Sequence, residues 1–358
     1  MKRYILLNPG PVNVSPRVQQ ALLRGDLCHR EEEFSDLLVA IRTKLLRAFV
    51  PRDYTAVPVS GSGTLAVEAM VSSAMPEGRK LLVINNGVYG ERMLHMAEAH
   101  RIPTVELRYN WTERPDLSQI ESTLQADSTI HAVALVHHET TTGLLNLVNE
   151  VGAITRRAGR WLLLDAVSAL ASEELDMVRD GIDLCACTAN KCIQGLPGVS
   201  FVLVSNAAMV AMQQYPQRSL YLHLPLHWEA QERRSIPFTP SVQAWYALDE
   251  ALDELLEETV AKRIQRYHAA AHLLRDGFAR LGLKSLLPPD LQSHSLTSLL
   301  LPEGMTYPLL HDGLKERGFV IYEGQGKLQT GVFRVANMGH LTLDDFRQFL
   351  TALEAILS

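Results

Sequence analysis

The chain has 358 residues, of which 47% are hydrophobic and 21% are charged, and its formal net charge is -6. Because a single hydrophobic core rarely grows beyond roughly 250 to 300 residues, this length predicts a large domain and a smaller one. The negative charge, with no basic block in the sequence, argues against a protein that binds nucleic acid through its phosphates.

Residues 1–7 contain only a brief apolar run, which is too short for the core of a signal peptide or for a membrane span. No later run approaches about 18 apolar residues without a charge. The sequence therefore predicts a cytoplasmic protein without a membrane partner.

Between residues 54 and 204, short apolar runs alternate with helical patterns, which is typical of a parallel sheet wound with helices. Several runs are apolar at every position, and such runs are buried on both faces of a sheet. This region therefore predicts a doubly wound, mostly parallel α/β sheet. The predicted strands are residues 55–59, 80–84, 104–107, 131–136, 161–164, 184–187 and 200–204.

Residues 242–281 contain no glycine or proline before Gly277 and place leucines at helical spacing, so they predict one long helix or two in series. The pattern beyond them predicts a small α/β domain. Its expected strands are residues 296–301, 319–322 and 333–336, and its expected helices are residues 307–317 and a last one from Leu343. We predict a large domain at residues 15–252 and a small domain built from residues 1–14 and 253–358.

A glycine turn at residues 60–64, Ser-Gly-Ser-Gly-Thr, follows a predicted strand and precedes a helical pattern. Backbone N–H groups and the hydroxyls of Ser62 and Thr64 can converge there on an anion, which favours a phosphate site, although an ordinary glycine turn explains the same residues. The pattern Gly-x-Gly-x-x-Ala at residues 61–66 also fits an NAD-dependent dehydrogenase. That class needs an acidic residue about twenty positions later, where the sequence has asparagines at residues 85–86, so it is disfavoured.

The apolar run at residues 161–164 leads directly into Asp165. Because ligand crevices lie at the carboxyl ends of strands in open α/β sheets, Asp165 is expected at such a crevice. A buried carboxylate needs a partner, and a protonated pyridine nitrogen would be one. An Asp that caps the following helix is the alternative.

Lys191 follows the apolar run at residues 184–187 and is followed by Gly195, Pro197 and Gly198. Burial of a lysine at a strand end lowers its pKa toward the neutral amine, which is the nucleophile that imine formation requires. Read alone, Lys191 could equally be a surface lysine.

The cysteines do not have the spacing of a zinc site, and adjacent strand residues such as those at 137–139, His-His-Glu, face opposite sides of a sheet. We therefore predict no metal site and no disulfide.

Five motifs identify the chain as similar to a known family. They are Leu-Leu-Asn-Pro-Gly-Pro at residues 6–11, Gly-Ser-Gly-Thr at 61–64, His-Glu-Thr-Thr-Thr-Gly at 138–143, Ala-Asn-Lys-Cys-Ile-Gln-Gly-Leu-Pro-Gly at 189–198 and Gly-Phe-Val-Ile-Tyr at 318–322. In this order they resemble the 2-aminoethylphosphonate:pyruvate aminotransferases, which are class V aminotransferases of pyridoxal-phosphate fold type I. The resemblance runs from about Tyr4 to the C-terminus and implies pyridoxal 5'-phosphate as cofactor.

The resemblance also implies roles for single residues. Lys191 would be the Schiff-base lysine, and Asp165 would be the partner of the pyridine nitrogen. Thr239 matches a threonine that reaches the phosphate from the neighbouring subunit, which implies a homodimer. The other implied cofactor contacts are Ser62, Gly63 and Thr64 at the phosphate, Tyr89 over the ring, Thr140 near the phenolic oxygen and Asn190 beside the lysine.

For the substrate, the resemblance implies Arg334 and Gly10. A guanidinium can hold a carboxylate or phosphonate with paired hydrogen bonds, and the flanking Phe333 and Val335 should point to the opposite face of the strand. The implied reaction moves the amino group of 2-aminoethylphosphonate to pyruvate, which gives phosphonoacetaldehyde and L-alanine in a ping-pong sequence. Residues 28–34 depart from close members, so an alanine-glyoxylate or serine-pyruvate aminotransferase is the alternative.

Overall fold

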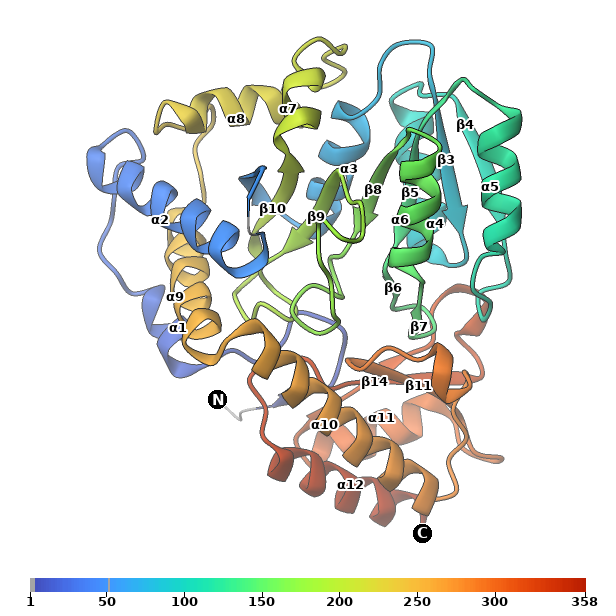
Figure 1. Cartoon of the computed structure of the whole chain (residues 1–358). Coiled ribbons are helices and arrows are strands. Elements are labelled where there is room, and N and C mark those ends of the chain that lie inside the picture. Colours follow the sequence, from blue (N-terminus) through green and yellow to red (C-terminus); the bar gives the residue numbers. More distant parts are fainter. Residues whose placement is uncertain (1–3, 51) are drawn as a thin grey trace.

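The computed structural model describes residues 4–50 and 52–358. Its large sheet has seven strands, which in spatial order are β2 (Tyr54–Gly61), β10 (Gly198–Ser205), β9 (Leu184–Thr188), β8 (Trp161–Asp165), β5 (Ile130–Val136), β3 (Lys80–Asn85) and β4 (Thr104–Arg108). Strand β10 runs antiparallel to both of its neighbours, and the remaining pairs are parallel. All seven predicted strands lie in this sheet, so the predicted mostly parallel α/β fold is confirmed (Figure 1).

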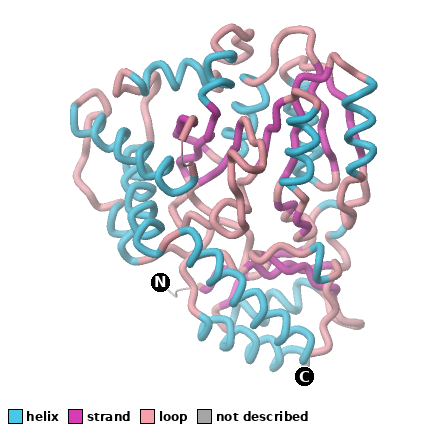
Figure 2. The backbone as a smooth tube through the Cα atoms, viewed as in Figure 1, coloured by secondary structure: helices cyan, strands magenta, loops and turns pink. Residues whose placement is uncertain are grey.

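Successive side chains of one strand enter two different cores, as expected for a sheet that is covered on both faces. In β5, Val133 and Leu135 belong to one buried cluster, whereas Ala132 and Ala134 belong to the other. Figure 2 shows the strands with helices around them. The first face is covered by α1 (Pro16–Ala21), α2 (Glu32–Phe49), α5 (Leu117–Ala126), α6 (Val148–Arg157) and α9 (Val242–Glu258), and the second by α3 (Gly63–Ser73), α4 (Val88–Ala99), α7 (Asn206–Met212) and α8 (Leu224–Glu232).

The predicted long helical segment consists of two helices in series, α9 and α10 (Val260–Arg280), which meet at Thr259. Thr259 has φ 74 and ψ 144, a conformation that cannot continue a helix. Its side chain then accepts a hydrogen bond from the N–H of Lys262 and caps the start of α10. The chain passes here from the large sheet to a smaller α/β part, at the bottom of Figure 1.

The smaller part has a core of its own, to which Leu7, Leu274, Phe333 and Phe349 belong. Its elements are β1 (Ile5–Leu6), η1 (Pro289–Leu291), β11 (Leu296–Leu300), α11 (Tyr307–Glu316), β12 (Phe319–Val320), β13 (Tyr322–Glu323), η2 (Gly326–Leu328), β14 (Val332–Ala336) and α12 (Leu343–Leu357). Because β1 pairs with β12, the N-terminal segment joins the C-terminal part of the chain. We propose that the large domain comprises residues 15–252 and the small domain residues 1–14 and 253–358. Residues 1–3 lie outside the described residues.

The carboxyl ends of β2, β3, β5, β8 and β9 lie along one edge of the large sheet, because these strands run parallel. After β5, a short hairpin of β6 (His138–Glu139) and β7 (Leu144–Leu145) extends from this edge. It reaches the smaller domain, where Ser293 donates its N–H to the Gly143 carbonyl oxygen. Within residues 4–50 and 52–358, no helix is both long and apolar enough to cross a membrane.

Candidate active site

Lys191 lies in the loop that leaves β9 at the carboxyl edge of the sheet. Its amine donates a hydrogen bond to the carbonyl oxygen of Pro9, in the N-terminal segment, at 2.5 Å. A Cβ added to Gly10 would lie 3.3 Å from Lys191 Cγ, so the glycine permits the N-terminal segment to pack closely against the lysine. Burial lowers the pKa of Lys191 to about 8, and the nearby Arg334 and Arg92 act in the same direction. The surface-lysine alternative is therefore wrong.

Asp165 is the last residue of β8 and is buried. The segment that follows it is a turn in which Asp165 Oδ1 accepts the N–H of Val167 at 3.0 Å, so the helix-capping alternative is wrong. Burial raises the pKa of Asp165 to about 6, against the opposing effects of the Val167 hydrogen bond and of Lys191 and Arg92. A buried carboxylate of this kind favours a cationic ligand beside it.

A pocket at this edge brings several predicted residues together. It is lined by Gly63, Thr64, Tyr89 and Asp165, and also by Arg92 of α4, which the sequence did not single out. Arg92 donates from Nη1 to Thr64 Oγ1 at 3.2 Å, and its guanidinium lies 4.7 Å from the centre of the Tyr89 ring. The pocket therefore combines a carboxylate at one wall with a cation and hydroxyls at another.

The glycine turn leads into α3 as predicted. Ser62 is the N-cap residue of α3, and Ser62 and Thr64 are exposed at the first turn of that helix, where backbone N–H groups are free of helical partners. Gly63 sits tightly, because a Cβ there would lie 2.9 Å from a methyl group of Val167. The helix N-terminus and these hydroxyls form an arrangement that suits a phosphate.

Arg334 lies in the middle of β14 and is only 5% exposed, so it is not a surface arginine. Phe333 and Val335 point into the core of the smaller domain, as predicted. The guanidinium donates from Nε to the Glu323 carbonyl oxygen and from Nη1 to the Thr140 carbonyl oxygen, both at 2.9 Å. Nη1 also donates to Gln325 Oε1 at 3.3 Å. Among the described residues Nη2 has no hydrogen-bond partner, which leaves one side of the guanidinium for an anion.

The other predicted residues do not line this pocket, and they include Asn190 and Thr239. Asn190 is adjacent to Lys191, and its Oδ1 accepts a hydrogen bond from Thr188 Oγ1 at 2.8 Å. Thr239 is exposed and lines a different depression with Ser60 and Tyr221, so the structure of one chain does not bring it to the lysine.

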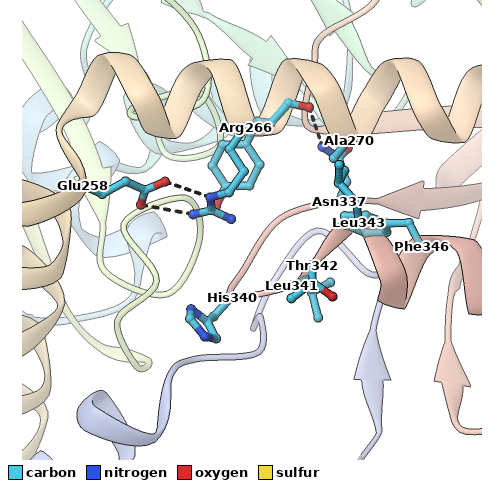
Figure 3. Close-up of a pocket in the computed structure, with 10 residues that line it drawn as sticks. Glu258, Arg266, Ala270, Asn337, His340, Leu341, Thr342, Leu343 and Phe346 are labelled. Atoms are coloured by element: carbon cyan, nitrogen blue, oxygen red, sulfur yellow. Dashed lines mark hydrogen bonds and ion pairs between the residues drawn. The ribbon is translucent and has the colours of Figure 1, made fainter.

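A separate cavity of about 300 Å³ lies between α10 and the start of α12 (Figure 3). In it Arg266 pairs with Glu258 at 2.8 Å, as drawn in Figure 3, so its charged groups satisfy each other. The hydroxyl of Tyr267 accepts a hydrogen bond from Gln194, in the loop of Lys191, at 2.7 Å. No predicted site residue lines this cavity. Its wall is connected to the lysine loop through the hydrogen bond between Tyr267 and Gln194.

Comparison with known proteins gives consistent matches along the chain. The family model for aminotransferase class-V matches residues 19–343. A relative from Syntrophobacter fumaroxidans, named 2-aminoethylphosphonate--pyruvate transaminase, is 38% identical over 98% of this chain and 95% of its own. A protein of the same name from Salmonella heidelberg is 37% identical over 99% of this chain and 98% of its own.

The chain belongs to the class V aminotransferases. Solved structures agree with this assignment. Alanine-glyoxylate aminotransferase from Nostoc sp. has a TM-score of 0.95 and 27% identity and covers 100% of this chain and 96% of its own. Pyridoxamine-pyruvate aminotransferase from Mesorhizobium loti has a TM-score of 0.92 and 27% identity over 99% and 92% of the two chains.

As a class V aminotransferase, this protein is a pyridoxal-phosphate-dependent transaminase of fold type I. The residues present fit that cofactor. Asp165 is a buried carboxylate that suits a protonated ring nitrogen, and Lys191 is a partly buried residue whose amine has a lowered pKa. The hydroxyl of Thr140 is buried and has no hydrogen-bond partner in the described part of the chain, as expected for a group that bonds a ligand.

Glu139 is a second residue, in contact with Tyr89, whose role the sequence did not indicate. It is fully buried, and burial raises its pKa to about 7. Its carboxylate accepts the N–H of Tyr89 at 3.1 Å and the hydroxyl of Thr141 at 2.5 Å, so it holds the first turn of α4 beside the β6–β7 hairpin. Gly87 makes space for the Glu139 carboxylate, because a Cβ at this position would lie 2.2 Å from Glu139 Cδ. Glu139 therefore positions Tyr89 through the backbone N–H of that residue.

Proposed function

We propose that this transaminase transfers the amino group of 2-aminoethylphosphonate to pyruvate and releases phosphonoacetaldehyde and L-alanine. The near full-length similarity to relatives that carry this name supports the choice of substrates. The structural observation that carries it is Arg334, a buried guanidinium with a free edge close enough to Lys191 to influence its pKa. Both substrates are anions, so one arginine serves both halves of the reaction.

Two buried groups carry the chemistry in this proposal. When bound, the cofactor supplies the electron sink that acidifies the hydrogen on the amine-bearing carbon of the substrate. The neutral amine of Lys191 takes that proton and later returns one, since burial has lowered its pKa toward the working range of a general base. Asp165 would hold a proton on the pyridine nitrogen of the bound cofactor, because a buried carboxylate needs a cationic partner.

Binding of the cofactor phosphate is assigned to the start of α3. Ser62, Gly63 and Thr64 would supply backbone and hydroxyl donors, and Arg92 would add the positive charge. Tyr89 would lie over the ring and Thr140 at the phenolic oxygen, with Asn190 next to the lysine. Gly10 would border the substrate, because the segment that contains it packs on Lys191.

We propose a homodimer in which Thr239 of one subunit reaches the phosphate site of the other. The exposure of Thr239, and its absence from the pocket lining of its own chain, support a role in trans. Sedimentation of the cofactor-loaded protein should give twice the mass of the chain, and a monomer would contradict the proposal. The cytoplasmic location stays a prediction.

A panel of amino donors tests the substrate assignment. The cofactor-loaded protein is mixed with 2-aminoethylphosphonate, alanine, serine or glycine in separate reactions without acceptor, and its visible absorption is followed. We expect the visible absorption band of the bound cofactor to disappear fastest with 2-aminoethylphosphonate. If serine, glycine or alanine acts and 2-aminoethylphosphonate does not, the alanine-glyoxylate or serine-pyruvate alternative holds, which the likeness to the Nostoc structure favours.

Replacement of Arg334 by lysine should lower kcat/KM for 2-aminoethylphosphonate by about 10- to 100-fold. A lysine keeps the charge but cannot bond the Glu323 and Thr140 carbonyl oxygens and an anion at the same time. The loss should appear mainly in KM, measured by coupled alanine formation. The exposed Arg347, changed to lysine, is the control, and equal effects of the two changes would contradict the assignment.

Capture of pyridoxal phosphate by the apoprotein should accelerate as the pH rises through about 8. The pKa of Lys191 is lowered to about 8, so the amine is protonated below this pH and nucleophilic above it. The rate of cofactor uptake is followed by absorbance from roughly pH 6 to 11. A rise centred near 10.4, the usual pKa of lysine, would contradict the account.

A further inference from the structure

A cluster of one carboxylate and two imidazoles lies outside the active site, where the two domains meet. Glu173 belongs to the segment between β8 and β9 of the large domain. His268 lies on α10 and His294 lies just before β11, both in the smaller domain. Their side chains are brought together only by the folded arrangement of the domains.

The ligand atoms of these three residues lie close together. His294 Nδ1 lies 2.8 Å from Glu173 Oε2, and His268 Nε2 lies 4.0 Å from the same oxygen. All three atoms lie within 4.8 Å of one another. Two ligands that are each about 2.1 Å from a tetrahedral metal are roughly 3.4 Å apart, so the observed separations lie on either side of that value.

The surroundings hold the cluster ready for a ligand. Glu173 is only 4% exposed, and its other oxygen, Oε1, accepts the backbone N–H of His294 at 2.6 Å, which fixes the direction of the carboxylate. His268 Nε2 is buried and has no hydrogen-bond partner among the described residues. The two imidazole rings are stacked with centroids 3.6 Å apart and planes 24° apart, so both rings would have to rotate before their nitrogens point to one ion.

Neighbouring charges permit a cation here. The exposed Glu174 adds a second negative charge close to His268. Arg275 is the nearby positive group, and its guanidinium is directed to the Ser293 carbonyl oxygen and to Thr297 Oγ1. His272 lies one turn along α10, with its ring 6.5 Å from that of His294, and is available for a fourth ligand position.

We propose that Glu173, His268 and His294 bind a divalent zinc ion that ties the segment after β8 to the smaller domain. Two imidazole nitrogens and one carboxylate oxygen form a donor set that zinc accepts in proteins. The ion would fix the relative position of the two domains and would not enter the transamination itself. This proposal is independent of the substrate assignment.

The test uses tag-free, cofactor-loaded protein that has been treated with a chelator and then titrated with zinc chloride. We expect one zinc ion per chain by calorimetry and a higher Tm with zinc than without. H268Q and H294Q should each weaken zinc binding by at least about 10-fold, since each removes a ligand. The control H311Q, which removes a histidine paired with Asp312 at 2.8 Å elsewhere on the chain, should bind zinc as the wild type does.

Glu173→Gln provides a second test, because it removes the charge and keeps a group that can accept the His294 N–H. Its Tm without zinc gives the structural contribution of the carboxylate, and the zinc-dependent increase in Tm should disappear. Cobalt should give the visible bands of a tetrahedral site in the wild type and lose them in H268Q. Absence of stoichiometric zinc binding, or zinc binding that is unchanged in H268Q and H294Q, would overturn the proposal.

Discussion

Transamination should fall by at least about 10³-fold when Lys191 is changed to alanine, because the variant lacks the only amine that we assign to the proton transfer. The fold should survive, since the change removes a buried group whose charged form is penalised by burial. The measurement is kcat with 2-aminoethylphosphonate and pyruvate, together with the visible absorption of the cofactor-loaded protein. Added methylamine should restore part of the rate by replacing the missing amine.

Lys80→Ala is the matched control. Lys80 starts β3 at the opposite edge of the sheet, where it pairs with Asp127 at 2.8 Å, so its loss should change kcat by less than about twofold. An alanine variant of Lys191 that keeps more than about a tenth of the wild-type kcat would remove the lysine from the proposed chemistry.

Replacement of Asp165 by asparagine should lower kcat by about 10²- to 10⁴-fold and at the same time stabilise the apoprotein. Activity falls because a neutral amide cannot hold a proton on the pyridine nitrogen. Stability rises because the pKa of Asp165 is raised from 3.8 to about 6, so the folded apoprotein loses stability as the pH rises through this range. At neutral pH the gain in the free energy of unfolding should be up to about 3 kcal/mol.

Asp183→Asn separates the two effects. Asp183 is a partly buried carboxylate whose pKa is also raised to about 6, but it lies just before β9, at the edge opposite the site, where it accepts the Leu162 N–H at 2.9 Å. Its amide variant should keep kcat within about threefold. Urea unfolding of the apoproteins and steady-state kinetics give both quantities. A D165N variant that is active, or an apoprotein that is strongly destabilised by this change, would contradict the account.

The strands of the large sheet could be predicted because burial on both faces leaves a strong local signal, as in residues 132–136 and 161–164. Breaks within continuous sequence patterns could not be predicted. Thr259 divides the long helix although the helical pattern continues on both sides of it. The predicted strand at residues 319–322 is divided at Ile321, because β12 pairs with β1 and β13 pairs with β14. Such breaks depend on tertiary partners.

The same distinction holds for the site. Asp165 and Lys191 could be found because each follows a buried strand, and strand ends collect at one edge of the sheet. Arg92 and Glu139 could not be found in this way, because each acts through a contact with another segment. Arg92 contacts Thr64, and Glu139 contacts Tyr89. The residues Glu173, His268 and His294 are likewise far apart in sequence, and the prediction of no metal site considered only neighbours in the chain.

The most direct measurement follows phosphorus NMR of the purified, cofactor-loaded protein with 2-aminoethylphosphonate and pyruvate. The account predicts that the signal of the donor is replaced by that of phosphonoacetaldehyde, with one L-alanine formed for each donor consumed. An unchanged donor signal, in protein that still transfers amino groups from serine or alanine to glyoxylate or pyruvate, would contradict the proposed function and leave the class V assignment intact.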